Sequence, residues 1–284
     1  MLTPRRLQAY RARTYHLKPG LRLRTKEHAI EFVQERGFAY FWPIQGIDLP
    51  SLWAAAAGDR PVPSEHDDPG HITWGWKDSL LGTRRWYYAK VLRKRATMIS
   101  LEVAPYFYAL SENYGSMEED YLEQYEAGRM TAEAKLLYET LLQKGPLDTV
   151  ALRREARMAS RDSDARFGRA LTALQADFKV LPVGVAEAGA WHYAYVYDLV
   201  ARHLPEVVEN ARRIDEPTAR ARLLDLYLGS VGAVPLDQPK RVFQWRPGEL
   251  EGTLAMLVKA GSLQRGLAME GSEGEWIARP ELAG

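Results

Sequence analysis

Apolar residues recur with the same helical spacing in two parts of the chain. In the segments 167–174 and 250–257 they follow one another at steps of four and then three residues. Such steps place the apolar side chains on one stripe of an α-helix. Each segment follows a Pro-Leu-Asp tripeptide, at Pro146 and Pro235, and each tripeptide starts eight residues after a tyrosine. The pattern predicts a duplicated structural unit.

Two strand-like runs follow each of these helices. They cover residues 179–186 and 191–197 in the first copy, and 262–269 and 275–279 in the second. Turns that contain glycine separate the runs, as in a hairpin. The order of helix, short helix, longer helix and hairpin is that of a winged helix, whose third helix commonly enters the DNA major groove. We therefore predict a mainly α fold with small β-hairpins, built from tandem winged-helix (helix-turn-helix) units.

The first half of the chain is less regular. Its periodicity predicts helices over residues 25–36, 49–57, 84–94 and 104–110. We predict three domains: a divergent N-terminal winged-helix-like domain over 1–128, a second winged-helix domain over 129–210 and a third over 211–284. The alternative for the third domain is a module that contacts protein, because Lys240, Arg241 and Arg246 are opposed there by Glu249 and Glu251.

Composition narrows the class of protein. With 284 residues, of which 46% are hydrophobic, the chain can build a substantial core. It contains no cysteine, which excludes disulfides, thiolate zinc sites and cysteine nucleophiles. No apolar run approaches the roughly 20 residues that span a bilayer, and the start does not resemble a secretory signal. We expect a soluble cytoplasmic protein.

The charges are segregated although the net charge is only +1. Residues 1–24 carry several arginines and no acid, residues 84–95 form a second acid-free basic block, and residues 112–126 are acidic. Segregation of this kind is expected when one face follows a phosphate backbone. Ordinary solvated helix faces explain each single block equally well. Our candidates for contacts to phosphates or base edges are Arg84, Arg85, Arg93, Lys94, Arg95, Arg153, Arg154, Arg157, Arg161, Arg166 and Arg169.

Aromatic residues and histidines suggest two further kinds of site. Rings beside cations can stack on bases, and the candidates here are Tyr40, Trp42, Trp74 and Trp76. Packing in the core is the competing interpretation. The cluster His66, Asp67, Asp68 and His71 offers the ligands that remain for a metal in a chain without cysteine. A polar loop with aspartate caps explains that cluster equally well, and we predict no metal site.

Several stretches resemble a known family. They are "RGFAYFWPIQGID", "EHDDPGHITWGWKDSLLGTRRWYYAK", "APYFYALSENYG", "GPLDTVALRREARMAS" and "VLPVGVAEAGAWHYAYVYD". The resemblance, nearly end to end, is to the AlkZ/YcaQ group of winged-helix DNA glycosylases, most closely to the AlkZ-related branch. It implies tandem winged-helix-like units around a basic channel for double-stranded DNA, without a metal or organic cofactor. It also implies excision of bulky alkylated bases by a glutamine followed two positions later by glutamine or aspartate.

The sequence departs from the family at this catalytic motif. Counted from Gly37, the two positions are Tyr40 and Trp42, which offer no base. A shifted alignment starts at Gln45, but an aspartate, Asp48, then arrives one residue late. In an extended strand a shift of one residue sends a side chain to the opposite face.

Gln45 and Asp48 can therefore converge only if Gly46 forms a bulge or turn. Cleavage of an N-glycosidic bond builds positive charge on the sugar, so it requires an anionic or carbonyl oxygen and a positioned water. Gln45 and Asp48 are our candidate catalytic residues on these grounds. Three functions follow: a protein that binds damaged or distorted duplex DNA, an active monofunctional glycosylase for alkylated bases, or a winged-helix scaffold for protein partners.

Overall fold

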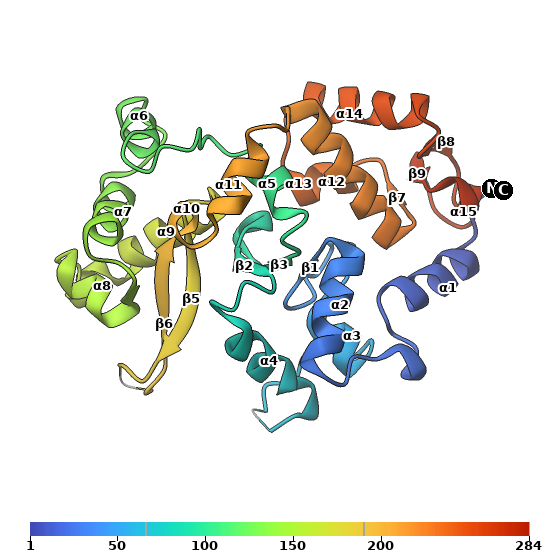
Figure 1. Cartoon of the computed structure of the whole chain (residues 1–284). Coiled ribbons are helices and arrows are strands. Elements are labelled where there is room, and N and C mark those ends of the chain that lie inside the picture. The colour runs from blue at the N-terminus through green and yellow to red at the C-terminus, as the bar shows by residue number, and fades with distance from the viewer. Residues whose placement is uncertain (66, 190, 284) are drawn as a thin grey trace. The chain divides into compact units, whose positions relative to one another are not determined.

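The computed structural model describes residues 1–65, 67–189 and 191–283 (Figure 1). These residues divide into two compact units. Unit 1 joins Met1–Trp76, Met98–Val103 and Glu216–Gly284, and unit 2 joins Lys77–Thr97 and Ala104–Asp215. The predicted division into three domains remains a prediction. No helix among the described residues has the length and apolar character needed to cross a bilayer.

Unit 1 is built from helices and short strands drawn from both halves of the sequence. Its helices are α1 (Pro4–Thr14), α2 (Lys26–Arg36), α3 (Leu52–Ala57), α12 (Glu216–Val231), α13 (Gln238–Phe243), α14 (Pro247–Lys259) and α15 (Pro280–Ala283), with 3-10 turns η1 (Pro19–Leu21) and η2 (Pro69–His71). Its strands are β1 (Phe38–Tyr40), β7 (Ala233–Pro235), β8 (Gln264–Leu267) and β9 (Trp276–Ala278). Helix α4 (Ile72–Leu80) and strand β3 (Ala96–Ile99) contribute residues to both units.

Unit 2 is mainly helical around one longer hairpin. Its helices are α5 (Ala104–Tyr108), α6 (Asp120–Glu126), α7 (Ala132–Lys144), α8 (Thr149–Glu155), α9 (Asp164–Ala176), α10 (Val200–His203) and α11 (Pro205–Ala211), with 3-10 turns η3 (Leu92–Lys94) and η4 (Arg161–Ser163). Its strands are β2 (Tyr87–Lys90), β4 (Leu147–Asp148), β5 (Val180–Ala186) and β6 (Ala194–Leu199).

The predicted duplication corresponds to two modules with the same order of elements. In unit 2 the order is α7, β4, α8, α9, β5, β6, and the strands form an antiparallel sheet of order β4–β6–β5. In unit 1 it is α12, β7, α13, α14, β8, β9, and the sheet order is β7–β9–β8. The predicted fold class, mainly α with small β-hairpins, is confirmed.

Local chemistry explains where α8 begins in the module of unit 2. The carboxylate of Asp148, from the first Pro-Leu-Asp tripeptide, accepts hydrogen bonds from the N–H groups of Val150 and Ala151 at 2.8 and 2.9 Å. It therefore satisfies two of the donors that the first turn of a helix leaves without partners. The apolar stripe of α9 is buried, and Phe167, Leu171 and Leu174 pack in a core cluster with residues of α7 and β6.

The predicted helix over residues 84–94 is wrong. The segment instead forms a turn, the strand β2 and the 3-10 turn η3. Tyr87 and Ala89 are fully buried while Lys90 is exposed, a pattern closer to the two-residue repeat of a strand. Arg93 and Lys94 have positive φ angles of 53° and 57°, which an α-helix cannot contain.

Helix α1 belongs to the same compact unit as the C-terminal module. Leu2, Leu7 and Tyr10 share a core cluster with Ala233, Met269, Ala278 and Leu282. The Tyr10 hydroxyl donates to the carbonyl of Gly229 at 2.8 Å. Residues assigned by prediction to the first domain and to the third domain thus build one core.

Candidate nucleic-acid interface

The corner between β1 and α3 carries the two predicted catalytic residues. The N–H of Ile47 donates to the carbonyl of Ile44 at 3.1 Å, and Gly46 has a φ of 74°. This is a turn that glycine adopts at no steric cost. The Gln238 side chain donates to the Gly46 carbonyl at 3.1 Å and holds the turn in place. Gln45 lies exposed within it.

Asp48 is engaged in a salt bridge within unit 1. Its two carboxylate oxygens accept hydrogen bonds from Arg11 at 3.1 and 3.0 Å. The same guanidinium donates to the carbonyls of Val231 and Ala233 at 3.0 and 2.9 Å. Asp48 therefore helps to fix α1 against the start of β7. The catalytic assignment of Gln45 and Asp48 stays a prediction.

Two of the four predicted base-stacking residues lie together with accessible surface. The ring of Trp42 meets that of Trp74 edge to face at 5.7 Å between centroids, and that of His71 at 5.8 Å. Trp42 is half-buried and Trp74 is exposed. Tyr40 and Trp76 are buried in the core. The stacking of these four residues on bases stays a prediction. Trp42 and Trp74 have solvent-accessible ring surface without any rearrangement.

The loop before α4 contains the residues of the metal alternative. His66 lies outside the described residues. Asp68 accepts hydrogen bonds from Arg60 at 2.9 and 2.6 Å and from the N–H of Gly70 at 2.7 Å. The hydrogen bond from Arg60 is the main cause that lowers the pKa of Asp68. This carboxylate thus caps η2 and pairs with an arginine.

The first predicted group of DNA contacts is exposed throughout. Its members lie between α4 and β3, and they are Arg84, Arg85, Arg93, Lys94 and Arg95. Arg84 also has a positive φ, 56°, like Arg93 and Lys94. The N–H of Lys94 donates to the carbonyl of Val91 at 3.0 Å, so the turn is closed by backbone hydrogen bonds. Left-handed conformations of residues other than glycine concentrate at functional sites.

The second predicted group, on α8, η4 and α9, divides into two sets. Arg153 donates to the carbonyl of Met158 and to Asp164, Arg154 donates to Glu155, and Arg166 lies 3.5 Å from Glu133. The second set, Arg157, Arg161 and Arg169, is exposed and makes no side-chain hydrogen bond or ion pair with any described residue. Helix α9, which carries Arg169, packs against both β2 and η3, and the turn η4, which carries Arg161, packs against α9.

We call the exposed members of both groups, except the three arginines paired with acids, the cationic surface. It consists of Arg84, Arg85, Arg93, Lys94, Arg95, Arg157, Arg161 and Arg169. All of these residues belong to unit 2.

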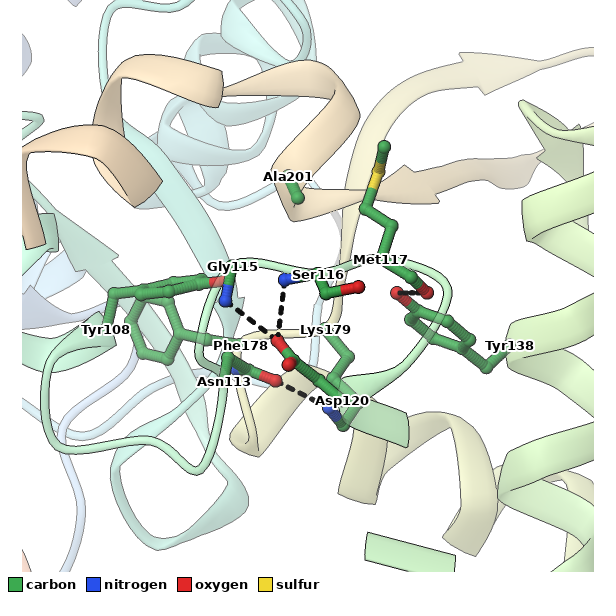
Figure 2. Close-up of a pocket in the computed structure, with 10 residues that line it drawn as sticks. All are labelled: Tyr108, Asn113, Gly115, Ser116, Met117, Asp120, Tyr138, Phe178, Lys179 and Ala201. Carbon is green, nitrogen blue, oxygen red and sulfur yellow. Dashed lines mark hydrogen bonds between the residues drawn. The ribbon is translucent and has the colours of Figure 1, made fainter. Parts of the chain in front are cut away.

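A pocket in unit 2 contains a buried lysine that sequence reasoning missed (Figure 2). The Lys179 ammonium donates to the side-chain oxygen of Asn113 and lies 5.7 Å from the ring of Tyr138. Burial lowers the pKa of Lys179 to about 8. Asp120 in the same pocket accepts hydrogen bonds from the N–H groups of Tyr114, Gly115 and Ser116. The sequence signal was a lysine placed directly before the apolar strand β5.

A second buried lysine, Lys77, lies in unit 2 and is only 2% exposed. Its ammonium is 2.7 Å from Asp78 and contacts the hydroxyls of Tyr193 and Tyr195. Burial lowers the pKa of Lys77, and Asp78 acts in the opposite direction. The sequence signal was a lysine directly after the helical Trp-Gly-Trp segment, which reads as an amphipathic helix rather than as a site.

The folded elements define a mainly helical protein with a DNA-glycosylase-like fold. The structure of Streptomyces sahachiroi DNA glycosylase AlkZ is similar with a TM-score of 0.60 and 13% sequence identity, over 98% of this chain and 70% of that chain. At this identity the likeness concerns the fold. No curated protein matches the sequence. The family model described as AlkZ related matches residues 23–244, and the chain belongs to that family.

Proposed function

We propose that this protein binds double-stranded DNA through the cationic surface of unit 2. The observation that carries the proposal is a set of seven exposed arginines and one exposed lysine in unit 2, some of them on the packed elements η3, α9 and η4. Three of these arginines have no acidic partner among the described residues. Phosphates satisfy such guanidinium groups, and release of counterions from DNA drives binding. A solved structure with a similar fold is that of a DNA glycosylase, which supports the same partner.

The partly accessible aromatic pair Trp42 and Trp74 favours distorted DNA over regular duplex. Bases in a regular helix are stacked on one another, and a ring can stack on a base only where that order is broken. Trp42 and Trp74 present such rings beside the half-buried His71. We propose that damaged or distorted sites bind more tightly than intact duplex.

The test of DNA binding removes cations whose backbone is in an ordinary conformation. We expect a variant with Arg85→Ala, Arg95→Ala, Arg161→Ala and Arg169→Ala to bind a labelled duplex at least about tenfold more weakly. The slope of log Kd against log salt should also become shallower by about 1 for every phosphate that is left without its cationic partner. Fluorescence anisotropy measures both the Kd and its salt dependence, in titrations at salt concentrations from about 50 to about 200 mM.

Arg129→Ala is the matched control. Arg129 is exposed and in the same unit, but it is paired with Glu112 in the acidic segment. The substitution of Arg129 removes one positive charge, as each of the four substitutions in the cationic surface does. Equal binding by the fourfold variant and the wild type, or binding that does not depend on salt, would contradict the proposal and favour the scaffold for protein partners.

A second candidate function is excision of alkylated bases at Gln45. The observation that favours it is an exposed glutamine in a turn three residues after Trp42 of the aromatic pair. Gln45 makes no side-chain hydrogen bond with a described residue, so Gln45→Ala should leave stability unchanged. We expect it to lower the rate of base release by about 100-fold, the scale of a lost positioning group for water.

Release is measured as abasic sites in duplexes that carry small and bulky alkyl adducts. Asp48→Asn is a less clean variant because it also weakens the salt bridge with Arg11. If the wild type produces no abasic sites from either class of adduct, excision is refuted and DNA binding alone remains.

A further inference from the structure

Lys77 lies in a cage of tyrosines inside unit 2. Its ammonium donates to the Tyr193 hydroxyl at 3.3 Å and to the hydroxyl of Tyr195. It also lies over the rings of Tyr88 and Tyr195, at 5.5 and 4.7 Å from their centroids. Asp78 closes the cluster, since it accepts a hydrogen bond from Tyr193 at 2.9 Å and lies 2.7 Å from Lys77.

This cluster has the chemical requirements of a reactive amine. A lysine becomes a nucleophile when it loses its proton, and burial favours the neutral form. Burial is the first cause of the lowered pKa of Lys77 and outweighs Asp78, which raises that pKa. The Asp78 carboxylate lies 2.7 Å from the ammonium, so an acceptor for the proton is at direct contact. Burial also raises the pKa values of Tyr193 and Tyr195, so both hydroxyls stay protonated and can donate to an oxygen.

The amine lies close below the surface. Tyr193 is 44% exposed and the Asp78 side chain is 28% exposed, whereas Lys77 is buried. Tyr193 forms the exposed side of the cage, and its hydroxyl makes hydrogen bonds with both Lys77 and Asp78. Tyr88 of the cage lies on β2, three residues after Arg85 of the cationic surface. A DNA backbone bound by Arg85 therefore passes near the strand that carries Tyr88, one of the tyrosines of the cage.

We propose that Lys77 is an amine nucleophile for the aldehyde carbon of an abasic deoxyribose in DNA. The inference rests on the proposed function, because the cationic surface must bring the DNA to the cage. An abasic site is the product that base excision leaves, so the proposed activity is an abasic-site lyase of the same protein.

The steps balance with water as the sole co-reactant. Lys77 gives its proton to Asp78, and the neutral amine adds to C1′ of the open sugar. The hydroxyl of the adduct takes the proton from Asp78 and leaves as water, which forms a protonated imine between Nζ and C1′. The Asp78 carboxylate then removes a proton from C2′. The C3′–O bond breaks, and its electron pair leaves with the 3′ phosphate. Water finally hydrolyses the imine and restores Lys77.

The experiment traps the imine by reduction. The full chain is incubated with a duplex that contains one abasic site, with borohydride present, and the adduct is mapped by mass spectrometry of peptides. In parallel, 2-deoxyribose 5-phosphate with cyanoborohydride tests the amine without any need for DNA binding. We expect adducts on Lys77 with both probes and cleavage of the abasic strand when the reductant is omitted.

Two variants control the interpretation. Lys77→Arg keeps the positive charge beside Asp78 but cannot form an imine, so the adduct and the strand cleavage should fall at least about 100-fold. Lys90→Arg is the matched control, because Lys90 lies on β2, two residues from Tyr88, and is exposed. It should react like the wild type. Circular dichroism establishes that Lys77→Arg is folded, and the mapping on the wild type does not depend on any variant.

The outcomes separate this inference from the proposed function. A wild type that binds the abasic duplex but forms no adduct, or forms it on other lysines, refutes the role of Lys77 and leaves DNA binding intact. An adduct on Lys77 from the free sugar, with no binding to duplex, supports the reactive amine and refutes the proposed function. Absence of both refutes both.

Discussion

Lys179 shows at the scale of one residue how burial changes chemistry. The side chain is 4% exposed, and its ammonium donates a hydrogen bond to Asn113 and lies near the ring of Tyr138. Its pKa is about 8 in the folded chain against an ordinary value of 10.5. Below pH 8 the lysine is protonated in both states, and burial of the charge opposes folding. Between pH 8 and pH 10.5 the unfolded chain binds more protons than the folded chain at this lysine, so the free energy of unfolding rises with pH.

Lys179→Met tests this linkage because methionine keeps the length of the side chain without its charge. We expect the free energy of unfolding of the wild type, relative to the variant, to increase by about 1 kcal/mol between pH 8 and pH 9. Denaturant titrations of both proteins at the two pH values measure the difference. The tyrosines ionise at higher pH in both proteins and cancel. A difference that does not change with pH would contradict the lowered pKa.

Residue types could be predicted from the sequence, but their partners could not. Convergence of Gln45 and Asp48 required a bulge or turn at Gly46, and a turn is present there. Nothing in that spacing indicated that Arg11, from a helix 37 residues earlier, occupies the Asp48 carboxylate. Similarly, the arginines on α8 and α9 were equivalent in sequence, and only the fold separates Arg153, paired with Asp164, from the exposed Arg169.

Elements with a long apolar repeat were predicted well, and short ones were not. The stripe of α9 and the hairpin of β5 and β6 agree with the structure to within a few residues. The predicted helix over residues 84–94 was wrong because the strand β2 is only four residues long. A strand of this length is too short for its two-residue repeat to outweigh a helical one. Positive φ angles at arginine and lysine have no signal in a single sequence.

Gly82 provides a test at the scale of elements. It lies in the turn after α4 with a φ of 72°, and a Cβ added there would overlap the carbonyl oxygen of Val183 on β5. Gly82→Ala must therefore move the turn away from the hairpin. We expect a loss of about 2–4 kcal/mol in the free energy of unfolding, measured by denaturant titration.

Gly128→Ala is the control for backbone strain alone. Gly128 has a φ of 69°, but a Cβ added there meets no atom within 4 Å. Both substitutions place alanine in the left-handed region, at a cost of about 1 kcal/mol. Equal destabilisation by the two variants would show that the approach of the turn to β5 contributes nothing.

At the scale of the whole molecule, the chain builds its compact units from segments that are distant in sequence. Unit 1 combines three segments, and α1 shares a core with the module of α12 to α15. A prediction that reads domains as consecutive segments follows the repeat of elements, which is local. Such a prediction misses the packing of α1 against the C-terminal module, because a long-range contact leaves no periodic signal along the chain.

Net charge is a poor guide to the partner of this molecule. The formal charge is +1, yet unit 2 contains both the acidic segment around α6 and the cationic surface. The charges in the acidic segment include Glu112, which is paired with Arg129, and Asp120, which caps backbone N–H groups. The capacity of a surface to bind a polyanion depends on local charge, which a sum over the chain conceals.

The left-handed backbone at Arg84, Arg93, Lys94 and Arg157 affects the entropy and the rate of ligand binding. A loop that is already held in one conformation loses little conformational entropy when a partner arrives. The affinity of such a surface is then determined by charge and fit rather than by the ordering of chain. Association should accordingly be fast, because the complex can form without a preceding rearrangement of these loops.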